Sequence, residues 1–152
     1  YKRQRGLGDV YKRQVGGSEI GSYKKNSKDD FVEINCRDVP EEGPTIAISK
    51  HHIGPKLEKW LSSINFINKL KVGSAIKFTL IAEGKADLFP RTTPTYEWDS
   101  AAGEAIIQGS RGYVTQMNGT NMVYGREDKK NPNFIAFGRP NWGKFLKGNN
   151  SG

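Results

Sequence analysis

The sequence predicts an α/β fold, a layered mixed sheet with flanking helices, and three observations support this prediction. Short apolar runs that suit strands alternate along the chain with segments of helical periodicity. Glycine, which often closes such elements, accounts for 18 of the 152 residues. The chain contains no repeat of the length found in solenoid proteins. Alternation of this kind is typical of a central sheet covered by helices.

Runs of β-branched and aromatic residues predict the strands. They cover residues 31–36, 45–49, 69–72, 86–89, 113–117, 121–124 and 133–137. Asn118-Gly119 predicts a tight turn between two of these strands. We expect residues 15–27 to form a loop or a frayed strand, and residues 90–94 to form a loop.

Three segments, 55–67, 75–83 and 99–108, predict helices. An apolar stripe marks one face of the first of them: Leu57, Trp60, Leu61 and Ile64. Pro55 suits the first turn of that helix. Gly84 suits the position that follows the end of the second helix. The third helix is rich in small residues, so it could pack tightly against a sheet.

Residues 1–14 are excluded from the predicted fold. Tyr1-Lys-Arg-Gln4 recurs as Tyr11-Lys-Arg-Gln14, and the run GLGDVYKRQ resembles translated sequencing-adapter sequence. We interpret this segment as a non-native tail; a basic arm that binds nucleic acid is the alternative. Residues 15–44 are then a strand and loop lead-in, residues 45–138 the main body, and residues 139–152 a polar tail.

The net charge of +8 first suggests a nucleic-acid partner. Half of it lies in residues 1–14, and the other 138 residues carry 19 basic and 15 acidic side chains. A mildly basic body also suits an enzyme whose substrate carries several phosphates.

Other classes of protein are disfavoured. No apolar run approaches the roughly 20 residues of a membrane helix, and no signal peptide is recognised. The single Cys36 cannot form an internal disulfide, which fits a reducing compartment, and we expect it to be a small apolar filler on a strand. The first residue, Tyr1, suggests a fragment, a processed product or an incomplete reading frame.

We expect ligand-binding or catalytic residues where strands end, because open α/β sheets bind ligands at the carboxyl ends of their strands. Ser49, Lys50, His51 and His52 follow a short strand and could hold a phosphate or a base. The alternative is that both imidazoles are exposed to solvent, since two His side chains do not make a metal site.

A second junction contains Gly73, Ser74 and Lys77. Gly73 permits a sharp turn and Ser74 stands where a helix N-cap is wanted. The Lys77 ammonium can lie on the same helix face as the Ser74 hydroxyl, so the junction could bind a phosphate. An ordinary capped helix with a surface lysine remains an equal alternative.

A third junction is Trp98-Asp-Ser-Ala-Ala-Gly103, preceded by Arg91. Asp99 at a helix start either caps free N–H groups or turns an oxygen to a hard cation such as Mg²⁺. Ala101, Ala102 and Gly103 would allow close approach to a neighbouring element. Arg91 can offer a bidentate fork to phosphate.

These three segments, in this order, resemble the inositol-monophosphatase superfamily, and within it the CysQ-type 3′(2′),5′-bisphosphate nucleotidases. The strongest runs are GSAIKFTLIAEGKADLFPR and WDSAAGEAI, with AISKHH, NGTNMVY and NPNFIAFG also similar. The resemblance covers about Ile46 to Gly138 and implies the carboxy-terminal half of that fold, with residues 45–138 binding the nucleotide. Gly109-Ser-Arg-Gly112 departs from the family's usual turn.

The resemblance also implies roles for single residues. Asp99 would be a metal ligand beside the substrate. The other implied substrate contacts are Ser49, His52, Gly73, Ser74, Lys77 and Arg91. The implied reaction is Mg²⁺-dependent hydrolysis of 3′-phosphoadenosine 5′-phosphate to AMP and phosphate, which removes a by-product of sulfate assimilation.

The family's upstream Glu-Glu pair and Asp-Pro-x-Asp-Gly-Thr segment, which supply most of the metal ligands, are absent from this sequence. Glu41-Glu42 is interpreted as a solvated turn. We therefore expect a missing amino-terminal half as the partner of this chain, and little or no activity without it. We also expect marginal stability, because that half would cover an open face or edge of the sheet.

An inositol- or fructose-bisphosphate-type phosphatase is the alternative within the superfamily. A basic nucleic-acid-binding module is the alternative from another class, and a non-catalytic scaffold is a third. The preferred interpretation expects no nucleic-acid partner and no membrane span. It implies a cytoplasmic protein, with attachment at the inner face of the membrane left open, and the oligomeric state undetermined.

Overall fold

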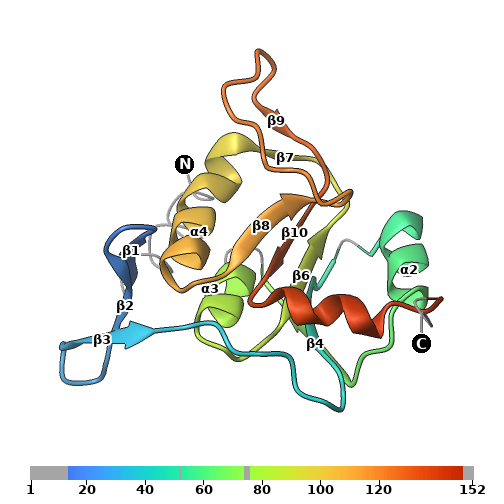
Figure 1. Cartoon of the computed structure of the whole chain (residues 1–152). Coiled ribbons are helices and arrows are strands. Elements are labelled where there is room, and N and C mark those ends of the chain that lie inside the picture. The colour runs from blue at the N-terminus through green and yellow to red at the C-terminus, as the bar shows by residue number, and fades with distance from the viewer. Residues whose placement is uncertain (1–13, 52, 74–75, 149–152) are drawn as a thin grey trace.

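A five-stranded mixed sheet forms the centre of the protein, in the strand order β5-β4-β6-β10-β8 (Figure 1). The computed structural model describes residues 14–51, 53–73 and 76–148. Strands β5, β4 and β6 run parallel, whereas β10 pairs antiparallel with both β6 and β8. Their bounds are β4 Thr45–Ser49, β5 Asn68–Val72, β6 Leu88–Arg91, β8 Tyr113–Gln116 and β10 Phe134–Phe137. The predicted α/β fold with a mixed sheet is confirmed.

Helices cover both faces of this sheet. Helix α2 (Pro55–Ser62) and the 3₁₀ helix η1 (Pro140–Phe145) lie on one face, and α3 (Ile76–Ala82) and α4 (Glu97–Gly109) lie on the other (Figure 1). Each face has its own apolar cluster, one including Ile46, Ile48 and Leu57 and the other Phe78, Phe89, Ile107 and Phe134. The sheet therefore separates two cores.

The predicted apolar stripe of α2 packs as expected. Leu57 is buried, and Trp60 and Leu61 pack against the same cluster. Pro55 occupies the start of the helix, where its missing N–H needs no partner. The helix ends at Ser62, and Ile64 forms an isolated bridge with Leu146.

The prediction of a polar tail after Gly138 is wrong for residues 140–145, which form η1. Its apolar side chains Trp142 and Phe145, followed by Leu146, pack against the α2 side of the core. Asn and Gly residues between them mask this apolar spacing in the sequence. Residues 149–152 lie outside the described part of the chain.

The small-residue helix α4 approaches α3 closely at one point. A Cβ on Gly103 would lie 2.5 Å from ring atoms of Phe78, so only glycine allows this contact. Ala101 and Ala102 are exposed, so the prediction that they contribute to the approach is wrong. Asp99 lies on the first turn of the same helix.

Residues 15–27, predicted as a loop or frayed strand, contain two strands of a separate three-stranded sheet: β1 (Gln14–Gly17) and β2 (Gly21–Lys25), with β3 (Phe31–Ile34). This sheet packs on α4: the buried Ser22 hydroxyl donates to the Ile106 carbonyl at 2.8 Å. Gly109 lies against Ser22, which explains a glycine near the end of α4. Cys36 is buried as expected, but it follows β3 rather than lying on it.

Strand β6 extends further than predicted and includes Pro90 and Arg91. Its pairing with β4 is limited to Ile46 and Leu88, so the missing N–H of Pro90 breaks no ladder on that side. The extension places Arg91 on the sheet rather than in the predicted loop.

The connection between β8 and β10 differs from the prediction. Of residues 121–124, only Asn121 pairs, in an isolated bridge with Thr115, so the strand predicted there is wrong. Instead, β9 (Lys130–Asn131) pairs with β7 (Thr95–Tyr96) directly before α4. We call residues 121–131 the arm, which projects beside the start of α4 (Figure 1).

A buried carboxylate ties the lead-in to the main sheet. Asp87, with no exposed side-chain surface, accepts hydrogen bonds from Arg37 Nε and Nη2, both at 2.9 Å. The same carboxylate accepts from the Thr45 N–H at 2.8 Å, at the start of β4. Three segments are therefore joined at one buried anion.

Asp87→Ala should lower the free energy of unfolding by about 2–3 kcal/mol, because it leaves a buried N–H and a guanidinium without their acceptor. Chemical denaturation monitored by circular dichroism measures this change. Asp38→Ala, which removes an exposed carboxylate paired with Arg139, is the control and should have little effect. Equal losses in the two variants would contradict the assignment.

Candidate functional site

The candidate site lies at the carboxyl ends of the parallel strands. Ser49 ends β4 and Arg91 ends the adjacent β6. The Arg91 Nη1 donates to the Ser49 Oγ at 3.1 Å. Two residues predicted from separate sequence segments therefore meet, at the edge of the sheet where open α/β folds bind ligands.

Lys77, near the start of α3, has no exposed surface at all. Its Nζ lies 5.1 Å from the centre of the Phe89 ring and has no hydrogen-bond partner among the described residues. Burial, together with the nearby positive charge of Arg91, lowers the pKa of Lys77 to about 8. The alternative of an ordinary surface lysine is excluded by this burial.

Arg91 is the second cation of the site; its side chain is partly buried, and its Nε is buried. Burial lowers the pKa of its guanidinium, and the negative charge of Asp99 opposes that shift. Within the described ranges its Nε has no hydrogen-bond partner. Buried donors of this kind are normally satisfied, so the site lacks an acceptor facing Lys77 and Arg91.

Asp99 lies at the third position of α4 rather than at its N-cap, which is Tyr96. Its Oδ2 accepts from the Tyr96 N–H at 3.0 Å, while no hydrogen bond to its Oδ1 is recorded for the described part of the chain. The geometry is therefore compatible with both predicted roles of Asp99, helix capping and cation binding: one oxygen caps the helix and the other is available to a cation.

Two of the remaining predicted site residues, His52 and Ser74, lie outside the described residues. Gly73 is exposed, and the space a Cβ would occupy there is open. Lys50 and His51 are also exposed, which agrees with the alternative given for His51.

The arm contributes polar groups that the sequence analysis missed. Tyr124 donates to the Glu104 Oε2, and Gln108 donates to Oε1 of the same carboxylate at 3.1 Å. Burial raises the pKa of Glu104, and burial with the Glu104 carboxylate raises the pKa of Tyr124. Asn131 Nδ2 contacts the first turn of α4. The arm has no regular periodicity, so only the tertiary contacts identify these residues.

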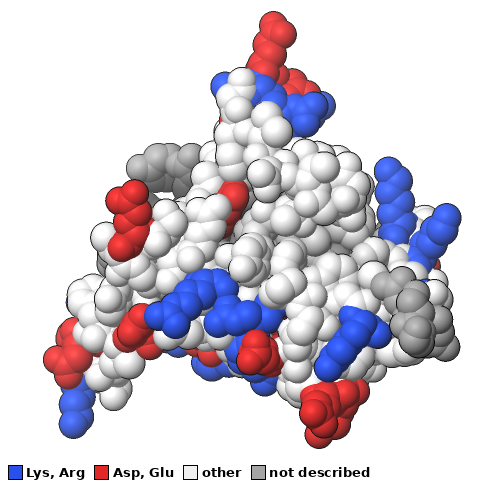
Figure 2. Space-filling model, in the orientation of Figure 1, with Lys and Arg blue, Asp and Glu red and all other residues white. Residues whose placement is uncertain are grey.

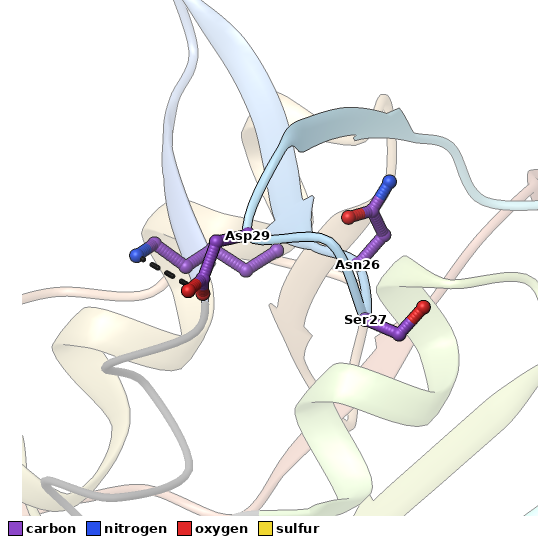
Figure 3. Close-up of a pocket in the computed structure, with 4 residues that line it drawn as sticks. Asn26, Ser27 and Asp29 are labelled. Carbon is purple, nitrogen blue, oxygen red and sulfur yellow. Dashed lines mark ion pairs between the residues drawn. The ribbon is translucent and has the colours of Figure 1, made fainter.

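Other surface features do not mark a competing site. A hollow lined by Asn26, Ser27 and Asp29 lies at the turn between β2 and β3, where Asp29 pairs with Lys25 (Figure 3). Another lies at the tip of the arm. Basic and acidic side chains are interspersed on the face shown in Figure 2. Within the described ranges, no helix combines the length and apolar character that crossing a bilayer requires.

Asp99 fits Mg²⁺ as a single oxygen ligand. Mg²⁺ requires near-octahedral oxygen coordination and binds proteins through one or two carboxylates plus water and substrate phosphates. No group of three His, Cys, Asp or Glu side chains that could hold a metal occurs among the residues that the structure describes. The described residues thus supply one carboxylate of such a site, near the partly buried guanidinium of Arg91.

Lys77→Met should raise the free energy of unfolding by about 1–3 kcal/mol, since it removes a buried charge without a partner. The difference from the wild type should shrink as pH rises above about 8, the lowered pKa of Lys77. Folded Lys77 loses its proton near pH 8, whereas a lysine in the unfolded chain keeps its proton up to its ordinary pKa of 10.5. Between these values the unfolded state binds more protons, so the free energy of unfolding of the wild type rises with pH.

Denaturant titrations at pH 7 and pH 10 measure this difference. Lys59→Met, on the exposed face of α2, is the matched control and should change stability little at either pH. A Lys77→Met variant less stable than the wild type at pH 7 would show that the ammonium has a stabilising partner.

Comparison with known proteins relates this geometry to one family. Residues 8–139 match the model of the inositol monophosphatase family. A 73-residue segment is 47% identical to an uncharacterised protein in the pss 5′ region of Rhizobium leguminosarum, covering 44% of this chain and 77% of that protein. The 3′(2′),5′-bisphosphate nucleotidase CysQ of Salmonella typhimurium is 37% identical over 103 residues, which cover 67% of this chain and 41% of that protein.

Solved structures agree with the sequence matches. CysQ from Bacteroides thetaiotaomicron superposes with a TM-score of 0.68 at 30% identity, over 78% of this chain and 50% of that one. An inositol monophosphatase from Zymomonas mobilis has a TM-score of 0.66 at 18% identity, over 84% of this chain and 48% of that one, which indicates the shared fold alone. The chain thus spans about two fifths of the CysQ of Salmonella typhimurium. The resemblance identified from the sequence is confirmed.

Proposed function

The chain belongs to the inositol monophosphatase family, and from this premise we propose that it forms the nucleotide-binding part of a CysQ-type 3′(2′),5′-bisphosphate nucleotidase. The observation that carries the proposal is a pair of cations, the buried Lys77 and the partly buried Arg91, whose Nζ and Nε lack acceptors among the described residues. Burying such groups is costly unless an opposite charge compensates them, and a bound anion would supply that charge.

A phosphate group matches this pair. Arg91 presents a planar fork, with Nη1 on the Ser49 hydroxyl and Nε still free to donate. Lys77 adds a point charge held against Phe89. Such an arrangement favours a dianionic phosphate that is bound but not cleaved, because cations alone supply no nucleophile.

The reacting phosphate would then lie toward Asp99. Magnesium held there would supply the charge neutralisation and the activated water that monoester hydrolysis needs. Asp99 would be the residue that holds it, with Oδ2 on the Tyr96 N–H and Oδ1 available to the cation. A substrate that contacts both the Lys77–Arg91 pair and the metal at Asp99 carries two phosphates. This favours 3′-phosphoadenosine 5′-phosphate over an inositol monophosphate.

Among the described residues, Asp99 is the candidate metal ligand. We therefore assign the hydrolysis to a longer enzyme, in which another part of the protein supplies the further metal ligands. We expect the chain alone to bind the nucleotide but to be inactive. The CysQ relatives are longer, which supports this assignment. An inositol-phosphate or fructose-bisphosphate phosphatase remains the alternative within the family.

Calorimetric titration of the chain with 3′-phosphoadenosine 5′-phosphate and with inositol 1-phosphate tests the substrate class. We expect tighter binding of the bisphosphate, and Arg91→Gln should weaken it at least about tenfold through loss of a charged, bidentate donor. Arg126→Gln, at the exposed part of the arm, is the control and should bind like the wild type. Preference for the inositol phosphate would favour the alternative phosphatase.

A chimera that joins residues 15–148 to the amino-terminal half of the Salmonella CysQ tests hydrolysis. It should release phosphate from the bisphosphate nucleotide in the presence of Mg²⁺, and Asp99→Asn should abolish most of this activity. Asp128→Asn, on the arm, is the charge-matched control. Full activity of the Asp99→Asn chimera would contradict metal ligation by this carboxylate.

The affinity of the chain for the bisphosphate nucleotide should fall as pH rises above about 8. Free Lys77, whose pKa is lowered to about 8, is protonated below that value and neutral above it. The bound phosphate stabilises the ammonium and raises its pKa, so binding takes up a proton near and above pH 8. Titrations from pH 6.5 to 9.5 in buffers of different ionisation enthalpy measure both effects. Affinity independent of pH in this range would contradict a role for Lys77 in binding.

A further inference from the structure

Asn131 and Asp99 both bind the backbone at the start of α4. The Asn131 Nδ2 lies 2.8 Å from the Tyr96 carbonyl, 2.8 Å from the Ser100 Oγ and 3.1 Å from the Thr95 Oγ1. The Tyr96 N–H, meanwhile, is bound by the Asp99 Oδ2. The peptide groups on both sides of Tyr96 are therefore fixed, one by Asn131 and one by Asp99.

The orientation of the Asn131 amide follows from its partners. A carbonyl oxygen only accepts hydrogen bonds, so the group facing Tyr96 must be the NH₂ and not the oxygen. This leaves the buried Oδ1 without a hydrogen-bond partner in the described part of the chain. Asn131 thus uses its donors on the first turn of α4 even though its acceptor is left unsatisfied.

The surrounding contacts hold the arm in place. Thr95 and Tyr96 pair with Asn131 and Lys130, and the Glu97 N–H donates to the Lys129 carbonyl at 2.9 Å. The Glu97 Oε1 accepts from the Arg126 N–H at 3.0 Å. The short pairing of β7 with β9 therefore sets the position of Asn131 relative to α4.

We propose that Asn131 is a positioning residue that orients the Asp99 carboxylate for cation binding. By holding the Tyr96 carbonyl and the Ser100 hydroxyl, it fixes the N-cap on which Oδ2 of Asp99 rests, and so directs Oδ1 outward. This inference rests on the proposed function for its ligand, the metal, but the clamp on Tyr96 can be measured without it. Neither the composition of the arm nor the resemblance in sequence assigned a role to Asn131.

Hydrogen exchange and Mn²⁺ titration of the ¹⁵N-labelled chain, followed by NMR, test the proposal. Asn131→Ala should speed exchange of the Tyr96 amide at least about tenfold, because Tyr96 loses the anchor on its carbonyl and its N–H is then held less firmly by Asp99. It should also weaken Mn²⁺ broadening of the Asp99 and Ser100 amide signals at least about fivefold in apparent affinity. Protection of the Ile106 and Ile107 amides should stay as in the wild type, which reports that the fold is retained.

Asn133→Ala, two residues along the same segment, is the matched control and should leave both readouts unchanged. If the alanine variant loses core protection, Asn131→Asp replaces it, because aspartate has the same size but no N–H donors. Unchanged Tyr96 exchange, or unchanged Mn²⁺ affinity with faster exchange, would overturn the positioning role.

The two proposals fail differently. Absence of Mn²⁺ broadening at Asp99 in the wild-type chain contradicts metal ligation by Asp99, and with it the positioning of a metal ligand by Asn131. If the Tyr96 amide is protected in the wild type and not in Asn131→Ala, the clamp itself still stands. Mn²⁺ binding that survives Asn131→Ala supports the metal site but removes Asn131 from it.

Discussion

The candidate site depends on the burial of one ammonium group that the described residues leave without an acceptor. Lys77 lies wholly inside the protein beside Phe89 and near Arg91, a partly buried cation. Two like charges in an apolar setting repel each other and are poorly solvated, so the fold alone gains nothing from placing them there. A ligand with negative charge would reverse this balance, and this is the physical basis of the proposed anion site.

The scaffold makes this arrangement possible through close packing of ordinary elements. The parallel strands β4 and β6 bring Ser49 and Arg91 to one edge of the sheet. Gly103 lets α4 lie directly on Phe78, so that Asp99 on the same helix comes near Arg91. The backbone thus sets the positions of the charged groups of the site.

Periodicity in the sequence predicted the main sheet and the helices on its faces, because burial repeats at regular intervals in those elements. It failed where pairing is short or depends on partners far along the chain. The pairing of β7 with β9 involves two residues in each strand, and η1 hides its apolar residues among Asn and Gly. The burial of Lys77 was equally invisible, since a lysine after a strand is usually exposed.

The same limit explains why the candidate site could be predicted only in part. Charged or hydroxyl side chains stand at strand ends or helix starts, so their chemistry can be predicted from residue type and position: Ser49, Lys77, Arg91 and Asp99. Asn131 is a neutral amide in an irregular arm, and its importance comes from three contacts with a helix start that precedes it in the chain. Residues that meet the ligand can be recognised from their chemistry, whereas residues that hold those groups in place become visible only when the long-range contacts are known.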